Sequence, residues 1–429
     1  MNINTLYKIY RDHPDISTDS RSIRQGCLFF ALKGEKFNGN AFVGDAIKKG
    51  AYIAIADKKD CPAGEKIITV DDVLLTLQQL ATYHRRACRF RILAITGSNG
   101  KTTTKELCSS VLRLKHKVFA TGGNLNNHIG VPLTLLSMKP DTEIGIVEMG
   151  ANHPQEITQL CNIAQPDYGL ITNIGKAHLE GFGSIEGVAR AKGELFSYLS
   201  LHKGTIFANA GDDRICGLIP DASKNVVLYN SRGTIRAEVR KSDLFLVLDV
   251  HDKGDIITLK SKLVGKYNTE NILAAYVVGK YFGITAQKIG KAIEAYTPAN
   301  NRSQYIRTAR HEIILDAYNA NPTSMIQALE NFFAIKRTDS LIILGEMLEL
   351  GESSSREHQA VIERLKKEPV KHVICVGQNF KTPAKSAGYN WYPDVGSLQS
   401  DLERSPLKAS FILIKGSRGN KLEKLMEVL

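Results

Sequence analysis

RILAITGSNGKTTTKELCSSVLRL, residues 91–114, joins an apolar run to a glycine-rich turn and then to a helical pattern. Such a unit predicts a phosphate-binding loop, because glycines let backbone N–H groups approach phosphate oxygens and the helix N-terminus adds positive potential. We expect Lys101 to reach the β- and γ-phosphates of a nucleotide and the Thr102 hydroxyl to ligate a bridging Mg²⁺. The predicted loop consists of Gly97, Ser98, Asn99, Gly100, Lys101, Thr102 and Thr103. The alternative is an ordinary turn rich in small residues, because the strict phosphate-loop pattern has Gly where this chain has Ile95.

The alternation of strands and helices continues beyond this loop. Apolar runs at 144–149, 168–174 and 205–210 predict strands, with helical patterns between them. This order is typical of a parallel sheet covered by helices on both faces. From about 230 to 262, short strands and Gly or Asp turns predict an antiparallel insertion, and a helical pattern resumes at 266–282.

Two further units flank this central one. The N-terminal unit has helical patterns and short apolar runs, with strands expected at 27–32 and 51–56 and helices at 40–49 and 71–86. After a linker at 296–304, which contains Pro298, four more strands alternate with helices, at 312–318, 340–347, 372–377 and 410–416.

The sequence therefore predicts an α/β protein of three domains. Residues 1–86 form a small mixed α/β domain, residues 87–297 a central P-loop-type parallel-sheet domain, and residues 298–429 a Rossmann-like doubly wound domain. A length of 429 residues agrees with this number.

Composition narrows the class of protein. Lys and Arg number 56 against 44 Asp and Glu, a formal net charge of +12, which favours anionic partners. The excess is not gathered into a run, which weakens a nucleic-acid interpretation. No run offers the roughly 18 apolar residues of a membrane span, and the N-terminus lacks a signal-peptide pattern, so we expect a cytoplasmic protein without membrane insertion. The seven cysteines are scattered, which predicts reduced, buried thiols.

Three further residues are candidates for metal binding. Glu148 closes an apolar run beside the phosphate loop, where a second magnesium ligand is needed; the alternative is a cap for the next helix. His178 follows a strand in a glycine-rich loop, where a surface or hydrogen-bonding role is the alternative. Lys192 lies on a helix predicted to begin at Ser184, and taken alone it would be a solvated surface lysine.

Polar residues elsewhere are candidates for nucleotide contacts. Asn268 and Asn271 lie three apart on a predicted helix, which indicates amide hydrogen bonds to a base or ribose, or else a capping and a surface asparagine. Arg302 could clamp a phosphate and Asp316 could accept from ribose hydroxyls, although a surface and a turn residue are the alternatives.

The turn after the last predicted strand is a further candidate for anion binding. It carries Lys415, Ser417 and Arg418 and leads into a helix. A basic surface turn without a ligand is the alternative.

Taken together and in order, these segments resemble the Mur ligases, the ATP-dependent amide-forming enzymes of bacterial cell-wall precursor synthesis. The family's ATP loop also lacks the first glycine, so Ile95 supports the resemblance. DAYNANPTSM (316–325) and LGEMLELG (344–351) separate the branch that adds a dipeptide from ligases that add one amino acid and from folylpolyglutamate synthetases. The other matching segments are TDSR (18–21), FFALKGEKFNGNAF (29–42), TGSNGKTTTKE (96–106), GNLNNHIGVPLTLL (123–136), EMGANHPQEI (148–157), AHLEGFGS (177–184), AKGELF (191–196) and KGSRG (415–419).

The resemblance implies an ATP-dependent ligase that joins D-Ala-D-Ala to UDP-MurNAc-tripeptide through an acyl phosphate, with two Mg²⁺ ions. Thr102 and Glu148 would serve one magnesium, and His178 and Lys192 a second, where the family lysine is carbamylated on its ε-nitrogen. The implied catalytic residues are Lys101, Glu148, His178 and Lys192. The implied ATP contacts are the phosphate loop with Asn268, Asn271, Arg302 and Asp316. The implied contacts to the other substrates are Ser20, Asn126, Asn127, Lys415, Ser417 and Arg418.

The resemblance also implies a monomer with a moving third domain, whose hinge we expect near Pro298. One segment departs from the family pattern: Asn38-Gly39-Asn40 stands where many members have Asp-Gly-His, which leaves the polar contacts of this loop open.

Three other functions are alternatives to this ligase. A nucleotide-driven switch or nucleic-acid motor would need basic-aromatic stacking surfaces, whereas the chain has one tryptophan, Trp391, and no such cluster. A sister ligase that adds a single amino acid would share the ATP loop. A binding protein without activity is disfavoured, because the four implied catalytic residues are all present.

Overall fold

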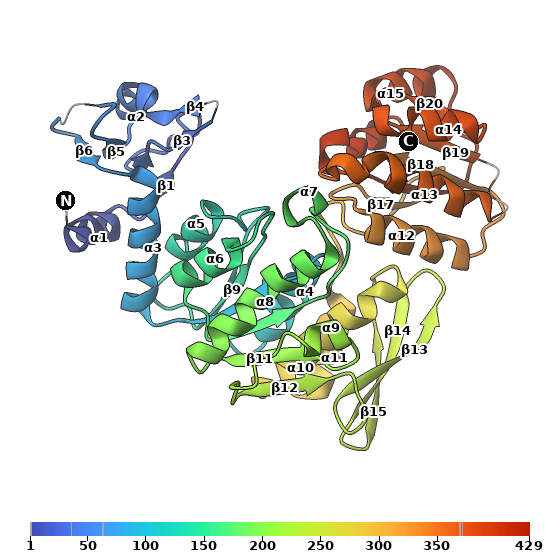
Figure 1. Ribbon diagram of the computed structural model, residues 1–429, viewed down its shortest axis with the longest axis horizontal. Helices are drawn as coiled ribbons and strands as arrows, with labels where there is room; N and C mark the ends of the chain where they lie inside the picture. The colour runs from blue at the N-terminus through green and yellow to red at the C-terminus, as the bar shows by residue number, and fades with distance from the viewer. Residues whose placement is uncertain (1, 36, 62–63, 369, 371) are drawn as a thin grey trace.

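The computed structural model describes residues 2–35, 37–61, 64–368, 370 and 372–429. Three lobes follow one another along the chain, and the N-terminal and C-terminal lobes both rise from the central one (Figure 1). Among the described residues no helix combines the length and the apolar character that a membrane crossing requires.

The N-terminal lobe is a small parallel sheet with helices, as the sequence predicts. Its four strands lie in the order β1-β2-β5-β6. The elements are α1 (Ile3–Asp12), β1 (Ile16–Ser17), β2 (Leu28–Phe30), the hairpin β3 (Lys33–Gly34) and β4 (Phe37–Asn38), η1 (Gly39–Phe42), α2 (Val43–Lys48), β5 (Ile53–Asp57), β6 (Ile67–Val70) and α3 (Val73–Cys88). Strands β1, β3, β4 and β6 were not predicted, because each has only two to four residues. Helix α1 was not predicted either, although it is amphipathic and buries Leu6 and Tyr10.

Helix α3 joins this lobe to the central one (Figure 1). It begins at Val73, two residues after the predicted start at Asp71, since Asp72 is the N-cap and its side chain accepts from the backbone N–H of Leu75. Its buried residues share one hydrophobic core with α5 and α6 of the central lobe. In that core the Tyr10 hydroxyl donates to the Leu136 carbonyl at 2.5 Å, and the His84 ring lies 2.8 Å from the Met138 carbonyl.

The central lobe is built on six parallel strands, which confirms the predicted sheet. Their order is β12-β11-β10-β7-β9-β8. The strands are β7 (Arg91–Thr96), β8 (Val118–Ala120), β9 (Ile144–Glu148), β10 (Tyr168–Ile171), β11 (Thr205–Asn209) and β12 (Val226–Tyr229). Ile95 of β7 pairs with Glu148 of β9, so the phosphate loop and Glu148 leave the same edge of the sheet side by side.

Helices cover both faces of this sheet. Helices α4 and α10 pack together on one face, and α3, α5, α6 and α8 on the other. The antiparallel insertion is confirmed as a separate three-stranded sheet whose inner residues pack on α10. The remaining elements of this lobe are α4 (Lys101–Leu112), α5 (Gly130–Leu136), α6 (Glu156–Ala164), α7 (Leu179–Phe182), α8 (Ile185–Leu201), α9 (Asp213–Cys216), β13 (Arg236–Ser242), β14 (Leu246–Asp252), β15 (Asp255–Lys260), η2 (Lys266–Asn268), α10 (Thr269–Tyr281) and α11 (Ala286–Ala295).

The C-terminal lobe is doubly wound, as predicted, with one antiparallel edge strand. Its order is β16-β17-β21-β18-β19-β20, and only β16 runs against its neighbour. The elements are β16 (Gln304–Arg307), β17 (Glu312–Asp316), α12 (Pro322–Ala334), β18 (Ser340–Gly345), η3 (Gly351–Ser353), α13 (Ser354–Lys366), β19 (His372–Val376), η4 (Gln378–Phe380), α14 (Lys381–Ser386), β20 (Asn390–Tyr392), α15 (Val395–Arg404), β21 (Phe411–Lys415), η5 (Arg418–Asn420) and η6 (Leu422–Glu427).

The linker between the central and C-terminal lobes is irregular, as its composition predicts. Helix α11 ends before Tyr296 and β16 begins at Gln304. Asn300, Asn301 and Ser303 all have positive φ, at 59°, 57° and 48°, a conformation that asparagine tolerates better than most residues. This stretch brings Arg302 to the junction.

Candidate active site

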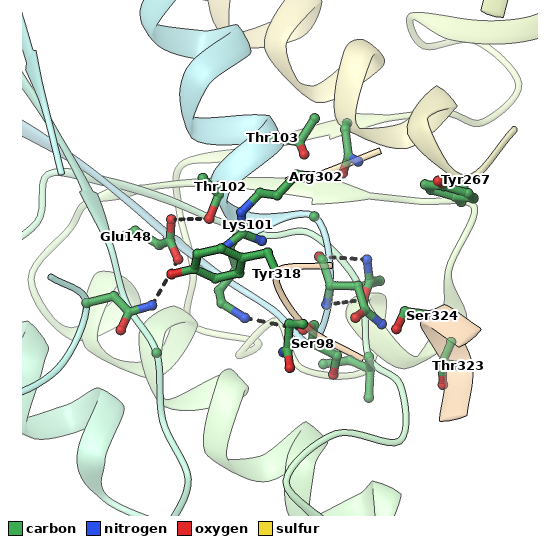
Figure 2. Close-up of a pocket in the computed structure, with 18 of the residues that line it drawn as sticks. Ser98, Lys101, Thr102, Thr103, Glu148, Tyr267, Arg302, Tyr318, Thr323 and Ser324 are labelled. Atoms are coloured by element: carbon green, nitrogen blue, oxygen red, sulfur yellow. Dashed lines mark hydrogen bonds between the residues drawn. The ribbon is translucent and has the colours of Figure 1, made fainter. Parts of the chain in front are cut away.

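A cavity of about 790 Å³ lies where the strand ends of the central lobe face the C-terminal lobe (Figure 2). Most of the predicted site residues line it. They are Ser98, Asn99, Gly100, Lys101, Thr102, Thr103, Asn126, Asn127, Glu148, His178, Asn268, Asn271, Arg302, Asp316 and Lys415. Gly97, Lys192, Ser417, Arg418 and Ser20 lie outside its lining.

At two positions of the phosphate loop a side chain larger than glycine would clash with a neighbouring residue. Gly97 has φ of +143°, and a Cβ there would lie 2.0 Å from the Thr172 hydroxyl oxygen. Gly100 has φ of +79°, and a Cβ there would lie 2.4 Å from Asn271 Oδ1. Helix α4 begins directly after this turn, so its free N–H groups face the cavity. The arrangement is an anion-binding helix N-terminus rather than an ordinary turn.

The end of β10 holds the loop in place. The Thr172 hydroxyl donates to the Asn99 carbonyl at 2.6 Å, and the Asn173 side chain both accepts from the Asn99 N–H and donates to its carbonyl, each at 3.0 Å. Sequence reasoning missed this pair, because it extended the strand to residue 174, whereas β10 ends at Ile171. The signal that could have found it is a polar Thr-Asn pair after an apolar strand.

Lys101 is held by its own loop. Its Nζ donates to the carbonyls of Gly97 at 2.6 Å and Ser98 at 3.2 Å. Burial lowers the pKa of Lys101, and the carboxylate of Glu148 only partly opposes this. A buried ammonium with only carbonyl partners favours an incoming phosphate.

Glu148 and Thr102 form an oxygen-rich set beside Lys101 (Figure 2). The Thr102 hydroxyl donates to Glu148 Oε2 at 2.7 Å, and the Asn126 amide donates to Oε1 at 2.9 Å. Such hard oxygen donors suit Mg²⁺, so the residues present fit the implied ion. The helix-cap alternative for Glu148 is wrong, because α6 begins only at Glu156.

A buried lysine stabilises the backbone behind this set. Lys105 of α4 donates from Nζ to the Thr121 carbonyl at 2.5 Å. The Thr121 hydroxyl in turn accepts from the Glu148 N–H at 3.0 Å. Helix α4 and the ends of β8 and β9 are thereby tied together. Sequence reasoning gave Lys105 no role.

His178 and Lys192 lie on either side of the cavity wall. His178 has φ of 50° and places Nδ1 2.6 Å from Glu349 Oε2 of the C-terminal lobe. Helix α8 begins after Ser184, as predicted, but the surface alternative for Lys192 is wrong, since the side chain is 1% exposed. Its Nζ donates to the Ala151 carbonyl at 3.3 Å.

The environment of Lys192 is unusual for an ammonium. Burial, with a contribution from Lys101, lowers the pKa of Lys192 to about 7. Among the described residues no group of three or more His, Cys, Asp or Glu side chains could hold a metal. An unmodified ammonium has no lone pair to offer a metal, so Lys192 would need modification to act as a ligand.

Asn268 and Asn271, near the start of α10, form a hydrogen bond with each other. The predicted helix is divided, with η2 ending at Asn268 and α10 beginning at Thr269. Asn271 Nδ2 donates to Asn268 Oδ1 at 2.8 Å, and Asn271 Oδ1 accepts from the Thr104 hydroxyl at 3.0 Å. Both side chains are buried, so the alternative of a surface asparagine is wrong. Their contact with a nucleotide stays a prediction.

Arg302 stacks on Tyr318, a residue that sequence reasoning missed (Figure 2). The guanidinium carbon lies 3.7 Å from the ring centre, a cation–π arrangement. Its Nε is buried without a hydrogen-bond partner within the part of the chain that the structure describes. Arg302 is therefore fixed in direction but electrostatically unpaired, which suits it to an anionic ligand.

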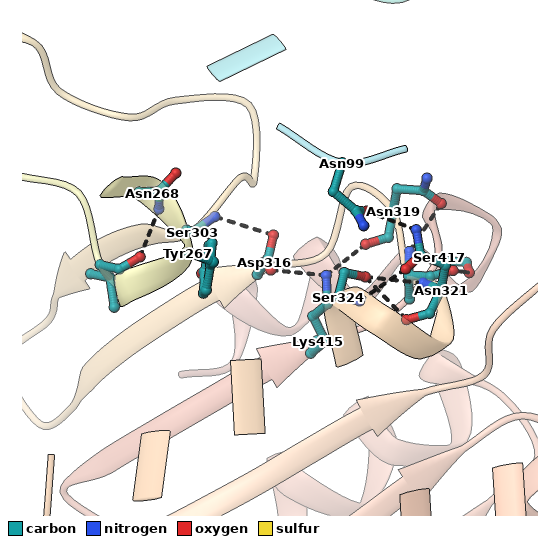
Figure 3. Close-up of polar contacts among 12 residues, drawn as sticks. Asn99, Tyr267, Asn268, Ser303, Asp316, Asn319, Asn321, Ser324, Lys415 and Ser417 are labelled. Atoms are coloured by element: carbon teal, nitrogen blue, oxygen red, sulfur yellow. Dashed lines mark hydrogen bonds and ion pairs between the residues drawn. The ribbon is translucent and has the colours of Figure 1, made fainter. Parts of the chain in front are cut away.

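Asp316 and Lys415 pair with each other in the C-terminal lobe (Figure 3). Lys415 Nζ lies 2.8 Å from Asp316 Oδ2 and 2.7 Å from the Asn319 carbonyl, while Asp316 Oδ1 accepts from the Ser303 N–H at 3.2 Å. The pair thus fixes the linker to the ends of β17 and β21. Its ribose and substrate contacts stay predictions.

Ser417, Arg418 and Ser20 have other surroundings. The Ser417 hydroxyl accepts from the Leu348 N–H at 3.1 Å and so joins two loops of the C-terminal lobe. Arg418 is exposed. Ser20 is buried in the N-terminal lobe, where its carbonyl accepts from Lys49.

The segment Asn38-Gly39-Asn40, which departs from the family pattern, is held by hydrogen bonds within the N-terminal lobe. Asn40 Nδ2 donates to Asp57 Oδ2 at 3.0 Å and to Asn38 Oδ1 at 2.8 Å, and Asn40 Oδ1 accepts from the Asp57 N–H at 2.9 Å. Asn40 is 6% exposed. Its amide therefore supports the loop rather than presenting a polar group to the surface.

The C-terminal lobe contacts the phosphate loop directly. Asn321 Nδ2 donates to Asn99 Oδ1 at 2.7 Å (Figure 3). Nearby, Lys176 Nζ lies 3.0 Å from Glu357 Oε1. An apolar contact accompanies these polar ones, since Val264 and Phe245 of the central lobe pack with the core of the C-terminal lobe.

Family models and curated relatives match nearly the whole chain. The models are "Mur ligase family, catalytic domain" at residues 15–85, "Mur ligase middle domain" at 95–279 and "Mur ligase, glutamate ligase domain" at 301–418. UDP-N-acetylmuramoyl-tripeptide–D-alanyl-D-alanine ligase of Bacillus subtilis is 34% identical, over 96% of this chain and 92% of that protein.

Solved structures agree with this relationship. MurF from Acinetobacter baumannii is 32% identical with a TM-score of 0.86, covering 96% of this chain and 92% of that one. MurF ligase from Thermotoga maritima, solved in complex with ADP, is 27% identical with a TM-score of 0.84, covering 96% of each chain.

Proposed function

Because the chain belongs to the Mur ligase family, we infer that it is an ATP-dependent ligase that joins D-alanyl-D-alanine to UDP-N-acetylmuramoyl-tripeptide. The reaction is a step in the synthesis of peptidoglycan precursors. The observation that carries this inference is the near full-length match to ligases of that name, together with residues 98–103 of the phosphate loop in the cavity lining.

The chemistry begins with activation of the tripeptide, because a carboxylate resists attack by an amine. A carboxylate oxygen attacks the γ-phosphorus of ATP, the bond to the β–γ bridging oxygen breaks, and ADP leaves. The amine nitrogen then attacks the acyl carbon, the C–O bond to phosphate breaks, and phosphate leaves. The incoming ammonium first gives one proton to solvent to become the attacking amine, and its nitrogen gives a second proton to solvent as the amide forms. No bond to the enzyme forms.

The side chains of the cavity position the reactants and offset negative charge. Lys101 and the N–H groups of the phosphate loop hold the β- and γ-phosphates, and Arg302 approaches the phosphates from the linker. Thr102 and Glu148 would hold a magnesium ion, which neutralises charge on the transferring group when bound. Asn268, Asn271 and Asp316 contact the nucleoside, and Ser20, Asn126 and Asn127 the UDP-sugar substrate. Lys415, Ser417 and Arg418 serve the substrate side of the C-terminal lobe.

We also propose that Lys192 is carbamylated and, with His178, serves a second magnesium. Two observations support this. The pKa of Lys192 is about 7, so much of the amine is neutral and able to react with CO₂. A carbamate would also replace the positive charge of Lys192 with an oxygen anion, the kind of donor that Mg²⁺ prefers. Intact-mass measurement of protein kept in bicarbonate, compared with the Lys192→Arg variant, tests this: loss of the added mass on removal of CO₂ should accompany loss of activity.

The three domains divide the work in this proposal. Residues 1–86 bind the UDP-sugar, residues 87–297 bind ATP, and residues 298–429 bind the dipeptide and close on ATP about the linker near Pro298. Closure excludes water that would hydrolyse the acyl phosphate. The protein acts as a cytoplasmic monomer. Small-angle scattering that shows no compaction with ATP analogue and UDP-substrate together would count against the closing motion.

The experiment that tests the function is mass-resolved product formation. Purified protein receives ATP, Mg²⁺ and UDP-MurNAc-tripeptide, with D-Ala-D-Ala in competition with single D- and L-amino acids. A product heavier by one dipeptide, with one ADP released per product, is expected. Conjugation of a single amino acid would favour the sister-ligase alternative, and release of ADP without conjugate would contradict the ligase function.

A further inference from the structure

Glu349 is a carboxylate on the cavity wall that the proposed mechanism does not use. It lies in the loop after β18, in the C-terminal lobe, and lines the same cavity as Lys101 and Glu148. Its backbone has φ of 62°, a conformation that glutamate rarely adopts. Such strain is typical of functional positions where the surrounding structure dictates the conformation.

The loop on both sides of Glu349 is held firmly. The Met347 N–H donates to His358 Nε2 at 3.0 Å, and the Leu348 N–H donates to the Ser417 hydroxyl at 3.1 Å. Leu350, on the other side, is buried in the core of the lobe. Glu349 itself remains 57% exposed. The fold therefore fixes the backbone and presents the carboxylate.

Glu349 is the available anion on this wall. Of the described C-terminal residues that line the cavity, only Asp316 and Glu349 are acidic, and Asp316 is neutralised by Lys415 at 2.8 Å. Among the described residues the ion-pair partner of Glu349 is His178, whose Nδ1 lies 2.6 Å from Oε2 across the junction of the lobes. A cation that enters from the C-terminal side would meet this carboxylate.

The incoming dipeptide is such a cation at its reacting end. An α-amino group has a pKa of about 8, so at neutral pH it arrives mostly as an ammonium. The cavity already contains Lys101 and Arg302, which favour anions and oppose an ammonium. An anion placed locally is therefore needed to bring the nitrogen near the acyl phosphate.

We propose that Glu349 binds the ammonium group of the incoming D-Ala-D-Ala and so positions the nucleophile. The proposal rests on the ligase function inferred above. His178 keeps the carboxylate oriented across the junction, and the ammonium takes or shares that contact when the dipeptide binds. Glu349 thereby selects amine substrates at the second step and has no part in making the acyl phosphate.

The test separates the two half-reactions. Glu349→Gln keeps the size of the side chain but removes its charge, and it is expected to raise KM for D-Ala-D-Ala at least tenfold, with KM for ATP and for the UDP-substrate within about twofold of wild type. Glu349→Asp should recover part of the affinity. The control is Glu352→Gln, an exposed carboxylate three residues on, which should behave as wild type.

A second readout uses hydroxylamine in place of the dipeptide. It is a small, largely neutral nucleophile that converts the acyl phosphate to a hydroxamate without needing ammonium recognition. Hydroxamate formation by Glu349→Gln should equal that of wild type. An equal loss with both nucleophiles, a changed Mg²⁺ requirement, or an unchanged KM for the dipeptide would overturn the proposal. Failure of the wild type itself to join D-Ala-D-Ala would instead overturn the proposed function.

Discussion

The two junctions between lobes differ in how much apolar surface they bury. The N-terminal lobe meets the central lobe through a continuous hydrophobic core, in which Leu6 and Tyr10 of α1 and Leu80 of α3 are buried with Leu135 and Met138. The junction with the C-terminal lobe is more polar: besides one small apolar contact, in which Val264 and Phe245 pack on the core of that lobe, it consists of single polar contacts such as Asn321 with Asn99 and of a linker with three residues of positive φ.

This difference predicts that the N-terminal lobe is held more firmly to the central lobe than the C-terminal lobe is. An apolar junction resists separation because it would expose buried surface to water, whereas polar contacts exchange for water at little cost. The cavity lies at the more polar junction. In our proposal, binding and chemistry therefore take place where the lobes part and close, while the lobe with the UDP-sugar site stays attached to the central one.

Tyr10→Ala should break the apolar junction and have the largest effect on stability. Tyr10 is 3% exposed, and its hydroxyl donates to the Leu136 carbonyl. Loss of a large aromatic side chain from a core costs about 3–5 kcal/mol, measured as the free energy of unfolding in urea. Tyr10→Phe removes only the hydrogen bond and should cost about 1 kcal/mol. Equal effects of the two variants would mean that packing across this junction contributes little.

Arg302→Met should show the reverse pattern at the polar junction. Because Nε of Arg302 has no partner within the described part of the chain, its loss should change the free energy of unfolding by less than about 1 kcal/mol. Ligase activity should fall about 100-fold, equivalent to ~3 kcal/mol of transition-state stabilisation. Arg310→Met, at an exposed turn, is the matched control. A strongly destabilised Arg302→Met protein would contradict the assignment of Arg302 to ligand binding.

The Lys176–Glu357 pair should contribute only slightly to holding the C-terminal lobe. Lys176 is 48% exposed and Glu357 is 7% exposed, so solvent screens the pair from one side. A double-mutant cycle with Lys176→Met and Glu357→Gln should give a coupling of about 0.5 kcal/mol that weakens with added salt. Coupling of several kcal/mol, insensitive to salt, would mean that this junction is locked rather than able to open.

The parts of the site that could be predicted are formed by residues close together in the sequence. The glycine-rich loop, its helix and the strand that ends at Glu148 follow from local pattern, since parallel strands end at the same edge of a sheet. The start of α8 at Ser184 follows from its capping side chain, which accepts from the Gly187 N–H. The three-lobe architecture follows from the repeated alternation of strands and helices.

The parts that could not be predicted are formed by segments distant in the chain. Tyr318 can be recognised as a site residue only from its stacking with Arg302 in the folded chain. Glu349 can be recognised only from its contact with His178 of another lobe. The burial of Lys192 could not be predicted either, because nothing in the sequence shows whether a lysine on a helix is buried in the folded protein. Local patterns therefore identify the ATP loop, and tertiary contacts identify the surface that meets the amine.

The smallest effect we expect is a dependence of the apolar junction on pH through His84. Burial lowers the pKa of His84 below its ordinary value of 6.5. Below about pH 6.5 the unfolded chain therefore binds a proton at this histidine that the folded protein does not bind. The free energy of unfolding is at its full value above this pH and declines as the pH falls toward the folded-state pKa. Thermal unfolding of His84→Gln should show a shallower decline between about pH 7.5 and 5.5, by a few degrees in Tm. The glutamine amide can still donate toward the Met138 carbonyl, which His84 contacts at 2.8 Å, so the packing is kept while the titration is removed. An unchanged slope would mean that water reaches the imidazole, and that the junction is less tightly closed than its core indicates.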